Sequence, residues 1–480
     1  MSIERRAVSA LKWATTAKVV VQLVSWSCTL IVIRLLTPED YGLMAKVGVV
    51  SGITSAIAEL GLGGAIIRTP RIGRDDLRKI LGLSILLGIA MTVAVAAASP
   101  LFARWFHEPS LAGPLAVSSL QILVSAFAVI PSAMASRELS FGLVSKVEMA
   151  TGVATAAITV ALAVAGAGVW ALVIGNLAGA LARSALLLLF SDRVWPRFST
   201  EGIAEHIKFG LTLVGSRMSY FVVVQSDIVI GSAFLSTTEI GQYAVALQLA
   251  TLPMSKMMGT INAVVMPAFS RKQGDSAAVR EALRRSMSLL AMAAFPLLWG
   301  ISAHARELVL VLFGPSWRDA VPALQILPLV VPFRMIFSVL LTTSLALGYR
   351  QLDARNTLAN VLVIPAGFLI GVQFGLVGLC TSWLVAVPMV YTLTVPAAMK
   401  NTGLTVDDLL RTAGPPALAA AMMYGAVGML RLFCADSIPP VALLAVLAGS
   451  SVLVYGAMLR VVSTKHYEVL FAFLRQLRSA

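Results

Sequence analysis

The stretch LLTPEDYGLMA, residues 35–45, returns in altered form as FLSTTEIGQYA at residues 234–244. The two segments align without gaps, and upstream of them LKW at 11–13 corresponds to IKF at 207–209. The positions that agree or nearly agree are Leu36 and Leu235, Thr37 and Ser236, Asp40 and Glu239, Gly42 and Gly241, and Ala45 and Ala244. This repetition indicates that the chain contains two related halves.

The 480-residue chain is far more apolar than a soluble protein of its size. Its residues are 58% hydrophobic and 12% charged, and its mean hydropathy is +0.87, whereas about 25% of the residues of soluble domains are charged. Apolar runs of about 20 residues, each long enough to cross a hydrocarbon core of about 30 Å, recur from end to end. The basic N-terminal segment leads directly into the first run without a cleavable signal pattern. We therefore expect a polytopic membrane protein.

The apolar runs and the polar breaks between them predict about fourteen transmembrane helices. Their expected ranges are 10–36, 41–67, 79–103, 111–136, 146–165, 168–191, 207–235, 240–267, 283–303, 320–346, 353–374, 376–399, 409–432 and 440–461. Most of the 37 Lys and Arg residues fall in alternate polar segments that include both ends of the chain. Such basic segments face the cytoplasm. Both termini are therefore expected inside and TPEDYG outside, with short outer loops throughout.

The two copies of the repeat stand an even number of spans apart, so the two halves share one orientation in the membrane. The chain is therefore predicted to be all-α, with two six-helix lobes related by a pseudo-two-fold axis along the membrane normal. The expected boundaries are 1–198 for the N-terminal lobe, 199–400 for the C-terminal lobe, and 401–480 for two additional helices and a basic cytoplasmic tail. Transporters with such repeats bind their substrates at the interface between the halves.

Within the repeated stretch, TPEDYG favours a turn between two helices over an active site. Pro38 suits the first turn of a helix, and the two acids that follow it complement the helix dipole. The spacing of Thr37 and Asp40 suits a capping box. Arg34, just before the turn, either reaches the outer headgroups or lines a cavity. Lys46 lies about one turn below the outer surface and is expected to extend its ammonium to that surface.

Ionisable side chains inside the predicted spans are candidate site residues, because each costs roughly 3 kcal/mol or more unless it faces protein or water. When the two halves are aligned by the repeat, Lys18 corresponds to Arg217, and each lies in the first helix of its half. Lys18 could instead reach the inner surface. Glu59 and Lys256 occupy near-equivalent positions on the second helices. These two could form a structural ion pair or bracket a ligand.

Two more ionisable residues lie in predicted spans of the second half. Asp227, in VVVQSDIVIGSAF, could couple transport to a proton or Na⁺, or could hold a neighbouring helix through hydrogen bonds. Arg334 follows Pro328 and Pro332 in mid-span. Carbonyls freed by such prolines are tolerated only beside protein or a water-filled cavity. Arg334 is therefore a candidate binding residue.

The deep charges are mostly cations, which favours an anionic ligand over a cationic one. The planar guanidinium of Arg suits phosphate particularly well. We expect a cationic cleft formed by Lys18, Arg217, Lys256 and Arg334. The three isolated cysteines and four scattered histidines show no metal or redox spacing, so no metal and no cofactor are expected beyond possible H⁺ or Na⁺ coupling. The net charge of +14 is attributed to basic cytoplasmic loops rather than to nucleic-acid binding.

The repeated motifs resemble a known family. RLLTPEDYGLMA and SDIVIGSAFLSTTEIGQYAVA (226–246) are similar to hallmark segments of the bacterial polysaccharide transporter family, the Wzx-type oligosaccharide flippases of the MATE-like superfamily. Fourteen spans, inner termini and a six-plus-six repeat fit that family over the whole chain. The basic loop RTPRIGRDDLRK (68–79) and the short outer loops look most like exporters of colanic-acid or exopolysaccharide repeat units.

The resemblance implies a flippase that moves undecaprenyl-pyrophosphate-linked oligosaccharides across the bacterial inner membrane for exopolysaccharide, lipopolysaccharide or capsule synthesis. Alternating access of the cationic cleft would carry the headgroup, and a polysaccharide polymerase and a chain-length regulator are possible partners. A multidrug or cation antiporter of the same superfamily and a lipid II flippase are the alternatives. A membrane polymerase or glycosyltransferase is less favoured, because it would be expected to have a sizeable outer loop or an acidic pair beyond a span. The chain is thus expected not to be an enzyme.

Overall fold

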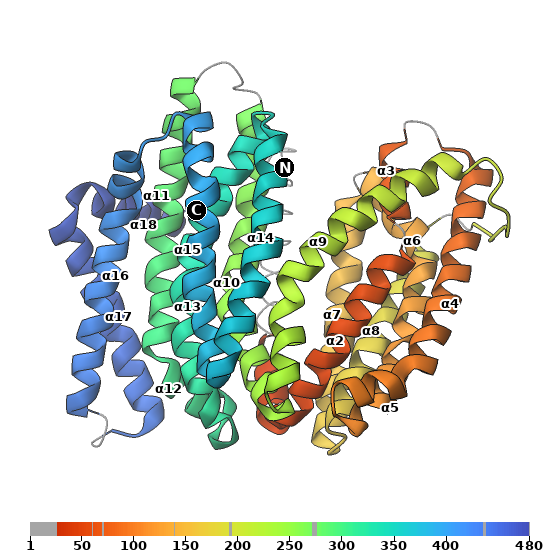
Figure 1. Cartoon of the computed structure of the whole chain (residues 1–480). Helices are drawn as coiled ribbons and strands as arrows, with labels where there is room; N and C mark the ends of the chain where they lie inside the picture. Colours follow the sequence, from red (N-terminus) through yellow and green to blue (C-terminus); the bar gives the residue numbers. More distant parts are fainter. Residues whose placement is uncertain are drawn as a thin grey trace, which may run out of the picture. The chain divides into compact units, whose positions relative to one another are not determined.

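The computed structural model describes residues 26–59, 61–69, 72–138, 140–191, 194–270, 276–434 and 438–479. Within these ranges every regular element is a helix. By its internal contacts the chain divides into two compact units, unit 1 (Met1–Ala233) and unit 2 (Phe234–Ala480). Figure 1 shows the helices of each unit in sequence colours. The lobe boundaries expected at 198 and 400 stay predictions.

The α-helices that begin in unit 1 are α2 (Pro38–Ala58), α3 (Leu62–Arg68), α4 (Arg74–Trp105), α5 (Ala112–Ser118), α6 (Leu120–Arg137), α7 (Phe141–Val164), α8 (Val169–Leu189) and α9 (Ala204–Phe234). Those of unit 2 are α10 (Thr237–Ser270), α11 (Ser276–Ala303), α12 (Ala305–Leu308), α13 (Val321–Ala346), α14 (Arg350–Gly371), α15 (Gly375–Thr402), α16 (Val406–Cys434), α17 (Pro440–Val462) and α18 (Thr464–Ser479).

Ten helical segments in the described ranges are long and apolar enough to cross a membrane. One of them, Arg350–Thr402, contains both α14 and α15. Two shorter apolar helices, Trp26–Leu35 and Phe221–Phe234, add to these. The all-helical, multi-pass membrane architecture is thus confirmed, whereas the expected count of fourteen spans is not.

The single helix expected over 41–67 is in fact two helices. α2 ends at Ala58 and α3 begins at Leu62. Between them Gly61 adopts the left-handed conformation, with φ of 58°, which only glycine enters without a steric penalty. The apolar pattern continues across the break, so hydropathy alone did not reveal it.

The repeated stretch forms the same turn twice, as expected. At the start of α2 the backbone N–H of Thr37 donates to Asp40 Oδ2 (2.9 Å), and the N–H of Asp40 donates to Thr37 Oγ1 (3.3 Å). At the start of α10 the N–H of Ser236 donates to Glu239 Oε2 (2.9 Å), and the N–H of Glu239 donates to Ser236 Oγ (3.3 Å). Both are reciprocal capping boxes. The sequence repeat is therefore a repeat of local structure.

In unit 1, α7 and α8 pack closely because small residues remove the bulk between them. A Cβ added at Gly175 or Gly179 of α8 would overlap the hydroxyl of Thr159 or Thr155 of α7, respectively. α6 packs against both α4 and α8. Buried Leu111, between α4 and α5, belongs to the apolar cluster of this unit.

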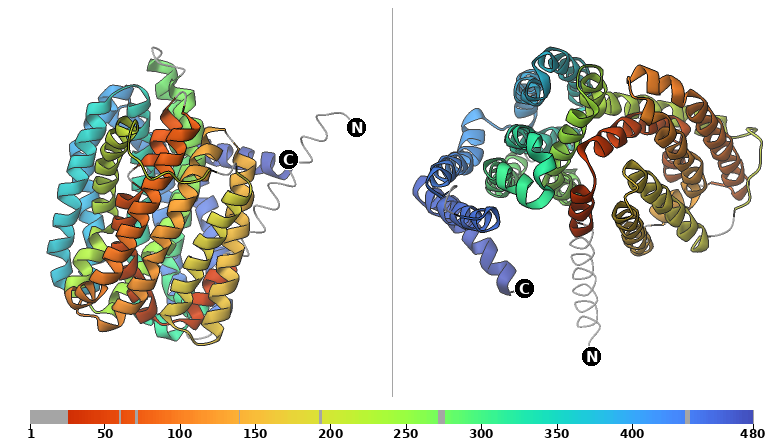
Figure 2. Two further views of the ribbon diagram at one scale, coloured as in Figure 1. Left: turned by 90° about the vertical axis from the view of Figure 1, so that its right-hand side faces the viewer. Right: turned by 90° about the horizontal axis from the view of Figure 1, so that it is seen from below.

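In unit 2, α13 packs against α10, α11 and α15, and buried residues run along its whole length. α16 packs on α11, and α17 packs on α16. The two helices that follow the expected six-helix lobe thus attach to unit 2. α18 runs across the view in the right panel of Figure 2, where α16 and α17 are seen nearly end-on.

The basic stretch RTPRIGRDDLRK has a structural role in unit 1. Asp75 of this stretch accepts a charge-assisted hydrogen bond (2.7 Å) from Arg197, which lies in the segment that leads to α9. Arg78 donates its Nε–H to the carbonyl of Trp195 (3.3 Å) and accepts the backbone N–H of Arg197 at its own carbonyl (2.9 Å). These contacts hold the segment before α9 against α4.

Candidate functional site

Arg334 is the expected binding residue whose environment the structure describes most fully. It lies on α13, and its guanidinium carbon stands 4.5 Å from the centroid of the Trp383 ring of α15. Its side chain is partly exposed, whereas Trp383 is 4% exposed. A guanidinium over an indole face is stabilised by about 0.5–2 kcal/mol. The ring leaves the N–H donors at the edge of the guanidinium available for an anion.

The position of Trp383 is in turn fixed by neighbouring aromatic residues. Its indole Nε1–H donates a hydrogen bond to the hydroxyl of Tyr243 on α10 (2.8 Å). Phe368 of α14 packs edge-on against the indole, with ring centroids 5.1 Å apart. Tyr243 is fully buried and belongs to the repeated motif GQYA. Four helices of unit 2 therefore set the orientation of one cation.

The helix that carries Arg334 continues through Pro328 and Pro332. α11 supplies side chains to carbonyls near these prolines. Trp299 donates its Nε1–H to the carbonyl of Leu329 (3.1 Å), and Ser302 donates its hydroxyl to the carbonyl of Gln325. The sequence allowed either protein or a water-filled cavity beside this stretch. The structure places protein, namely α11, beside these two carbonyls.

Asp227, on α9, is completely buried. Its Oδ1 accepts the backbone N–H of Ile228 (2.7 Å). A carboxylate at such a position is costly in a membrane unless it is partnered. Both readings of Asp227, ion coupling and structural hydrogen bonding, stay predictions.

Glu59 stands at the break between α2 and α3 rather than within a continuous helix. Its backbone N–H donates to the carbonyl of Ser55 (2.9 Å), and its own carbonyl accepts the N–H of Leu62 (2.9 Å). Ser84 and Ser125 line the same small pocket as its side chain. Pairing of Glu59 with Lys256 stays a prediction, because the side chain of Lys256 lies outside those described.

The expectation that Lys46 extends to the outer surface is wrong. The residue is 2% exposed, and its ammonium lies 5.9 Å from the centroid of the Phe106 ring. It also interacts electrostatically with Glu108, just beyond α4. The partners of Lys46 are thus in the protein, in unit 1. Arg34, by contrast, is exposed at the end of the helix Trp26–Leu35. Exposure fits both readings of this residue, contact with outer headgroups and the lining of a cavity, so both stay predictions.

The remaining cations of the expected cleft are not covered by the structure. Lys18 lies outside the described residues. Arg217 falls on α9, but its side chain, like that of Lys256, lies outside those described. The cationic cleft therefore stays a prediction, with Arg334 as its described member.

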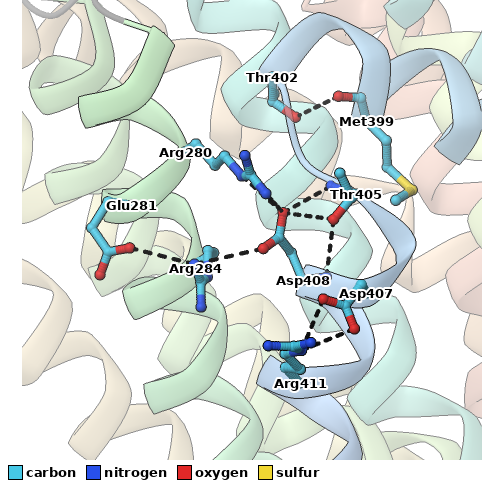
Figure 3. A network of polar contacts seen from close by, with 9 residues as sticks. All are labelled: Arg280, Glu281, Arg284, Met399, Thr402, Thr405, Asp407, Asp408 and Arg411. Atoms are coloured by element: carbon cyan, nitrogen blue, oxygen red, sulfur yellow. Dashed lines mark hydrogen bonds and ion pairs between the residues drawn. The ribbon is translucent and has the colours of Figure 1, made fainter.

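A charged network that the sequence analysis missed joins α11 to α16 (Figure 3). The carboxylate of Asp408 caps α16 by accepting the backbone N–H of Thr405 (3.0 Å). The same carboxylate pairs with Arg280 (2.5 Å) and Arg284 (3.6 Å) of α11. Its side chain is 5% exposed, so water screens the network little on that side. The Thr405 to Asp408 spacing repeats the capping-box pattern and could have revealed the cap, although not its arginine partners.

A second ion pair ties the other end of α16 to the α11–α12 corner. Arg431 holds Glu307 with two hydrogen bonds, from Nε to Oε1 (2.9 Å) and from Nη2 to Oε2 (2.7 Å). It also donates to the carbonyl of Ala303. Glu307 is 4% exposed. Ion pairs thus fasten α16 at both of its ends, and neither pair was anticipated from the sequence.

Comparison with known proteins places these features in a family context. A sequence model described as polysaccharide biosynthesis protein matches residues 31–322. The chain is 25% identical over 399 residues to the lipopolysaccharide biosynthesis protein WzxC of Escherichia coli (strain K12), covering 80% of this chain and 79% of WzxC. It is 26% identical over 301 residues to the succinoglycan biosynthesis transport protein ExoT of Rhizobium meliloti (strain 1021), covering 62% and 61% of the two chains.

Two solved structures share the fold. The lipid II flippase MurJ, in an inward closed conformation, matches with a TM-score of 0.74 at 14% identity, covering 94% of this chain and 99% of its own. An inward-facing multidrug resistance MATE family transporter of the MOP superfamily matches with a TM-score of 0.58 at 16% identity, covering 80% and 96%. At these identities the likeness concerns the fold alone, and it confirms the expected MATE-like architecture.

Proposed function

Because this chain belongs to the polysaccharide biosynthesis protein family, we propose that it is a flippase that moves a lipid-linked oligosaccharide across a bacterial membrane. The resemblance expected from the repeated motifs is thereby confirmed. The observation that carries the proposal is the family match over residues 31–322, together with relatives whose names specify lipopolysaccharide biosynthesis and succinoglycan transport. The substrate proposed from the resemblance is an undecaprenyl-pyrophosphate-linked repeat unit.

The chemistry of such a substrate explains why a protein is required. A diphosphate and a hydrophilic glycan cannot cross hydrocarbon unaided, because their charges and hydroxyls lose hydration there. A multi-pass helical protein can enclose the headgroup while the lipid tail stays in the bilayer. Alternating access of the predicted cationic cleft would then expose the headgroup to each side in turn.

Arg334 is the residue that we propose to hold the diphosphate within the membrane. Its guanidinium rests on an indole whose orientation Tyr243 fixes, so little side-chain freedom is lost when an anion binds. Charge-assisted hydrogen bonds from Arg to phosphate are about twice as strong as neutral ones. Lys18, Arg217 and Lys256 would complete the cleft.

Coupling to an ion gradient is proposed for Asp227 or Glu59, with H⁺ or Na⁺ as the ion. Localisation in the inner membrane with both termini in the cytoplasm is proposed from the distribution of Lys and Arg. A polymerase and a chain-length regulator are proposed partners, because they would consume the exported repeat unit. The name of ExoT, a transport protein, is consistent with our proposal that the chain performs no catalysis.

The two rival functions in the same superfamily are multidrug export and lipid II flipping. The fold does not separate them, because a MurJ structure and a MATE structure both share it. The sequence relatives favour polysaccharide export, since WzxC and ExoT carry polysaccharide names. The mainly cationic set of deep charges also favours an anionic headgroup over a cationic drug.

Deletion of the gene from its source bacterium tests the proposed function. Loss of a surface polysaccharide is expected, together with accumulation of lipid-linked repeat units and unchanged growth. Complementation with the wild-type gene should restore the polysaccharide. Lysis from arrested peptidoglycan synthesis would instead support lipid II flipping. Sensitivity to cationic drugs with normal surface polysaccharide would support a multidrug antiporter.

A further inference from the structure

A cavity of about 530 Å³ lies in unit 1 between α3 and the start of α9. Arg68 and Thr69 line it from the end of α3, and Glu205, His206 and Lys208 line it from α9. None of these residues belongs to the expected cleft. The volume lies within the range of about 300–1,000 Å³ that is typical of small-molecule sites. It could therefore hold more than a single inorganic ion.

The lining of this cavity carries two permanent cations and one acid. The guanidinium carbon of Arg68 lies 4.5 Å from the centroid of the Phe209 ring, so its orientation is set by an aromatic face. Lys208 is exposed and extends a second, flexible cation to the same cavity. Glu205 is the acid of the lining and is also exposed. The balance of charge favours an anion.

The imidazole of His206 supplies the second observation. Both ring nitrogens are buried, and among the residues that the structure describes neither has a hydrogen-bond partner. Buried polar groups are nearly always hydrogen-bonded, and an exception calls for a specific reason. His206 lines the cavity, but neither nitrogen is open to it in this conformation, so the imidazole would have to turn to donate its N–H to a ligand with acceptor oxygens. Thr69, in contrast, already donates its hydroxyl to the carbonyl of Ala65 (2.8 Å).

The place of the cavity in the sequence indicates which anion is available. Arg68 opens the basic stretch RTPRIGRDDLRK, and Lys208 lies in the basic segment that precedes the seventh predicted span. The Lys and Arg distribution predicts both segments on the cytoplasmic side. At that level the abundant anions are the phosphates of lipid headgroups. Arg recognises phosphate with its planar fork of donors, and Lys adds a point charge.

We propose that this cavity binds the phosphate-bearing headgroup of a lipid in the inner leaflet. Arg68 and Lys208 neutralise the phosphate, and His206 donates a hydrogen bond to one of its oxygens. Two lipids offer this chemistry: a polyprenyl diphosphate and an anionic phospholipid. Only the first of these sources rests on the proposed function, because the translocated intermediate would carry that group. The site would then receive the headgroup before it enters the cleft.

The test is lipid binding by the purified full-length protein in nanodiscs of phosphatidylcholine. Native mass spectrometry measures the binding of two probes, undecaprenyl diphosphate and phosphatidylglycerol, each titrated separately. Of the two probes, we consider the one that the wild-type protein binds more tightly. The double variant Arg68→Gln/Lys208→Gln is expected to bind this probe about tenfold more weakly than wild type does. Lys208→Gln alone, at an exposed side chain that folding does not require, should lose part of this affinity. Glu205→Gln should bind as tightly as wild type or more tightly.

A matched control is Arg350→Gln, which removes an exposed cation from α14 in unit 2 and should leave binding unchanged. His206→Leu removes both buried nitrogens, so it should weaken lipid binding while raising the thermal unfolding temperature of the lipid-free protein. If the double variant loses affinity mainly for undecaprenyl diphosphate, the site belongs to the translocated lipid. If it loses affinity mainly for phosphatidylglycerol, the site belongs to a phospholipid. Equal affinity of wild type and the folded double variant for both probes would overturn the proposal.

The lipid site and the proposed function fail in distinguishable ways. Lipid binding that depends on Arg68 and Lys208 in a protein whose deletion leaves polysaccharide export intact would support the site and refute the function. Normal lipid binding by the Lys208→Gln protein and by the double variant, combined with lost export in the deletion strain, would refute the site and support the function.

Discussion

The indole N–H of Trp383 donates a hydrogen bond to the hydroxyl of Tyr243 across 2.8 Å, inside unit 2. This one contact links the repeated sequence motif, which contains Tyr243, to Arg334, whose guanidinium lies over the same indole. The motif that reveals the internal repeat therefore also supports the candidate binding cation.

Replacement of Arg334 should impair export without unfolding the protein. Arg334→Ala removes a charge-assisted hydrogen bond worth about 1.5–3 kcal/mol, so transport should fall roughly tenfold to hundredfold. Arg334→Lys keeps the charge but loses the planar fork and should retain partial activity. Surface polysaccharide, normalised to the amount of protein in the membrane, is the measurement. Arg350→Ala, at an exposed cation of the same unit, is the control and should export normally. Full export by Arg334→Ala would exclude a binding role for this residue.

The support of Trp383 by Tyr243 can be tested with conservative variants. Tyr243→Phe removes the acceptor and leaves a buried indole N–H unsatisfied, which should lower the stability of unit 2 by about 1–3 kcal/mol. Trp383→Phe removes the donor and weakens the stacking of Arg334. The double variant should lose less stability than the sum of the single variants, because both remove the same hydrogen bond. Additive losses in thermal unfolding and in transport would show that the two residues act independently.

Much of the fold could be predicted from the sequence, because hydropathy and capping are local properties. The turn at Thr37 and Asp40, its repetition at Ser236 and Glu239, and the helical membrane architecture all follow from short-range patterns. The break at Gly61 did not, since a left-handed glycine interrupts a helix without interrupting its apolar pattern.

The partners of charged residues were much less predictable than the helices. Lys46 is buried because Phe106 and Glu108 reach it from the far end of α4, more than fifty positions along the sequence. Asp408 meets Arg280 across a gap of 128 residues. Such pairs depend on how helices pack, and no local spacing encodes them. Arg334 was found because two prolines mark its surroundings, whereas the supporting Trp383 carried no local signal.

The Asp408 network should stabilise the attachment of α16 to α11. Asp408→Asn removes the charge that Arg280 and Arg284 face, and it weakens the cap of α16. The free energy of unfolding should therefore fall by about 1–3 kcal/mol. This loss is smaller than for a fully buried ion pair, because both arginines are partly exposed. Its neighbour Asp407 pairs with Arg411 at the surface and provides a matched control.

Asp407→Asn should change the free energy of unfolding by no more than about 0.5 kcal/mol. Denaturant unfolding in detergent micelles, monitored by helicity, compares the two variants. Equal effects of the two substitutions would show that the α11–α16 network contributes no more than a surface pair.

The close packing of α7 and α8 gives a further stability prediction. Gly175→Ala places a methyl group against the hydroxyl of Thr159, so the helices must separate and the protein should lose about 1–3 kcal/mol. Gly152→Ala, on α7 with open space around its Cβ position, is the control and should be neutral or slightly stabilising. Thermal unfolding temperatures of the two variants decide the matter. A Gly175→Ala protein as stable as wild type would show that the helix contact can relax at no cost.

The most direct measurement is translocation by the purified protein in phospholipid vesicles. A polyprenyl-diphosphate-linked oligosaccharide is enclosed in the inner leaflet, and a membrane-impermeant lectin reports its arrival in the outer leaflet. The wild-type protein should move the lipid far faster than protein-free vesicles do, and Arg334→Ala protein should move it roughly tenfold to hundredfold more slowly than wild type. Transfer by the wild-type protein at the rate of protein-free vesicles would contradict the assignment as a lipid-linked oligosaccharide flippase.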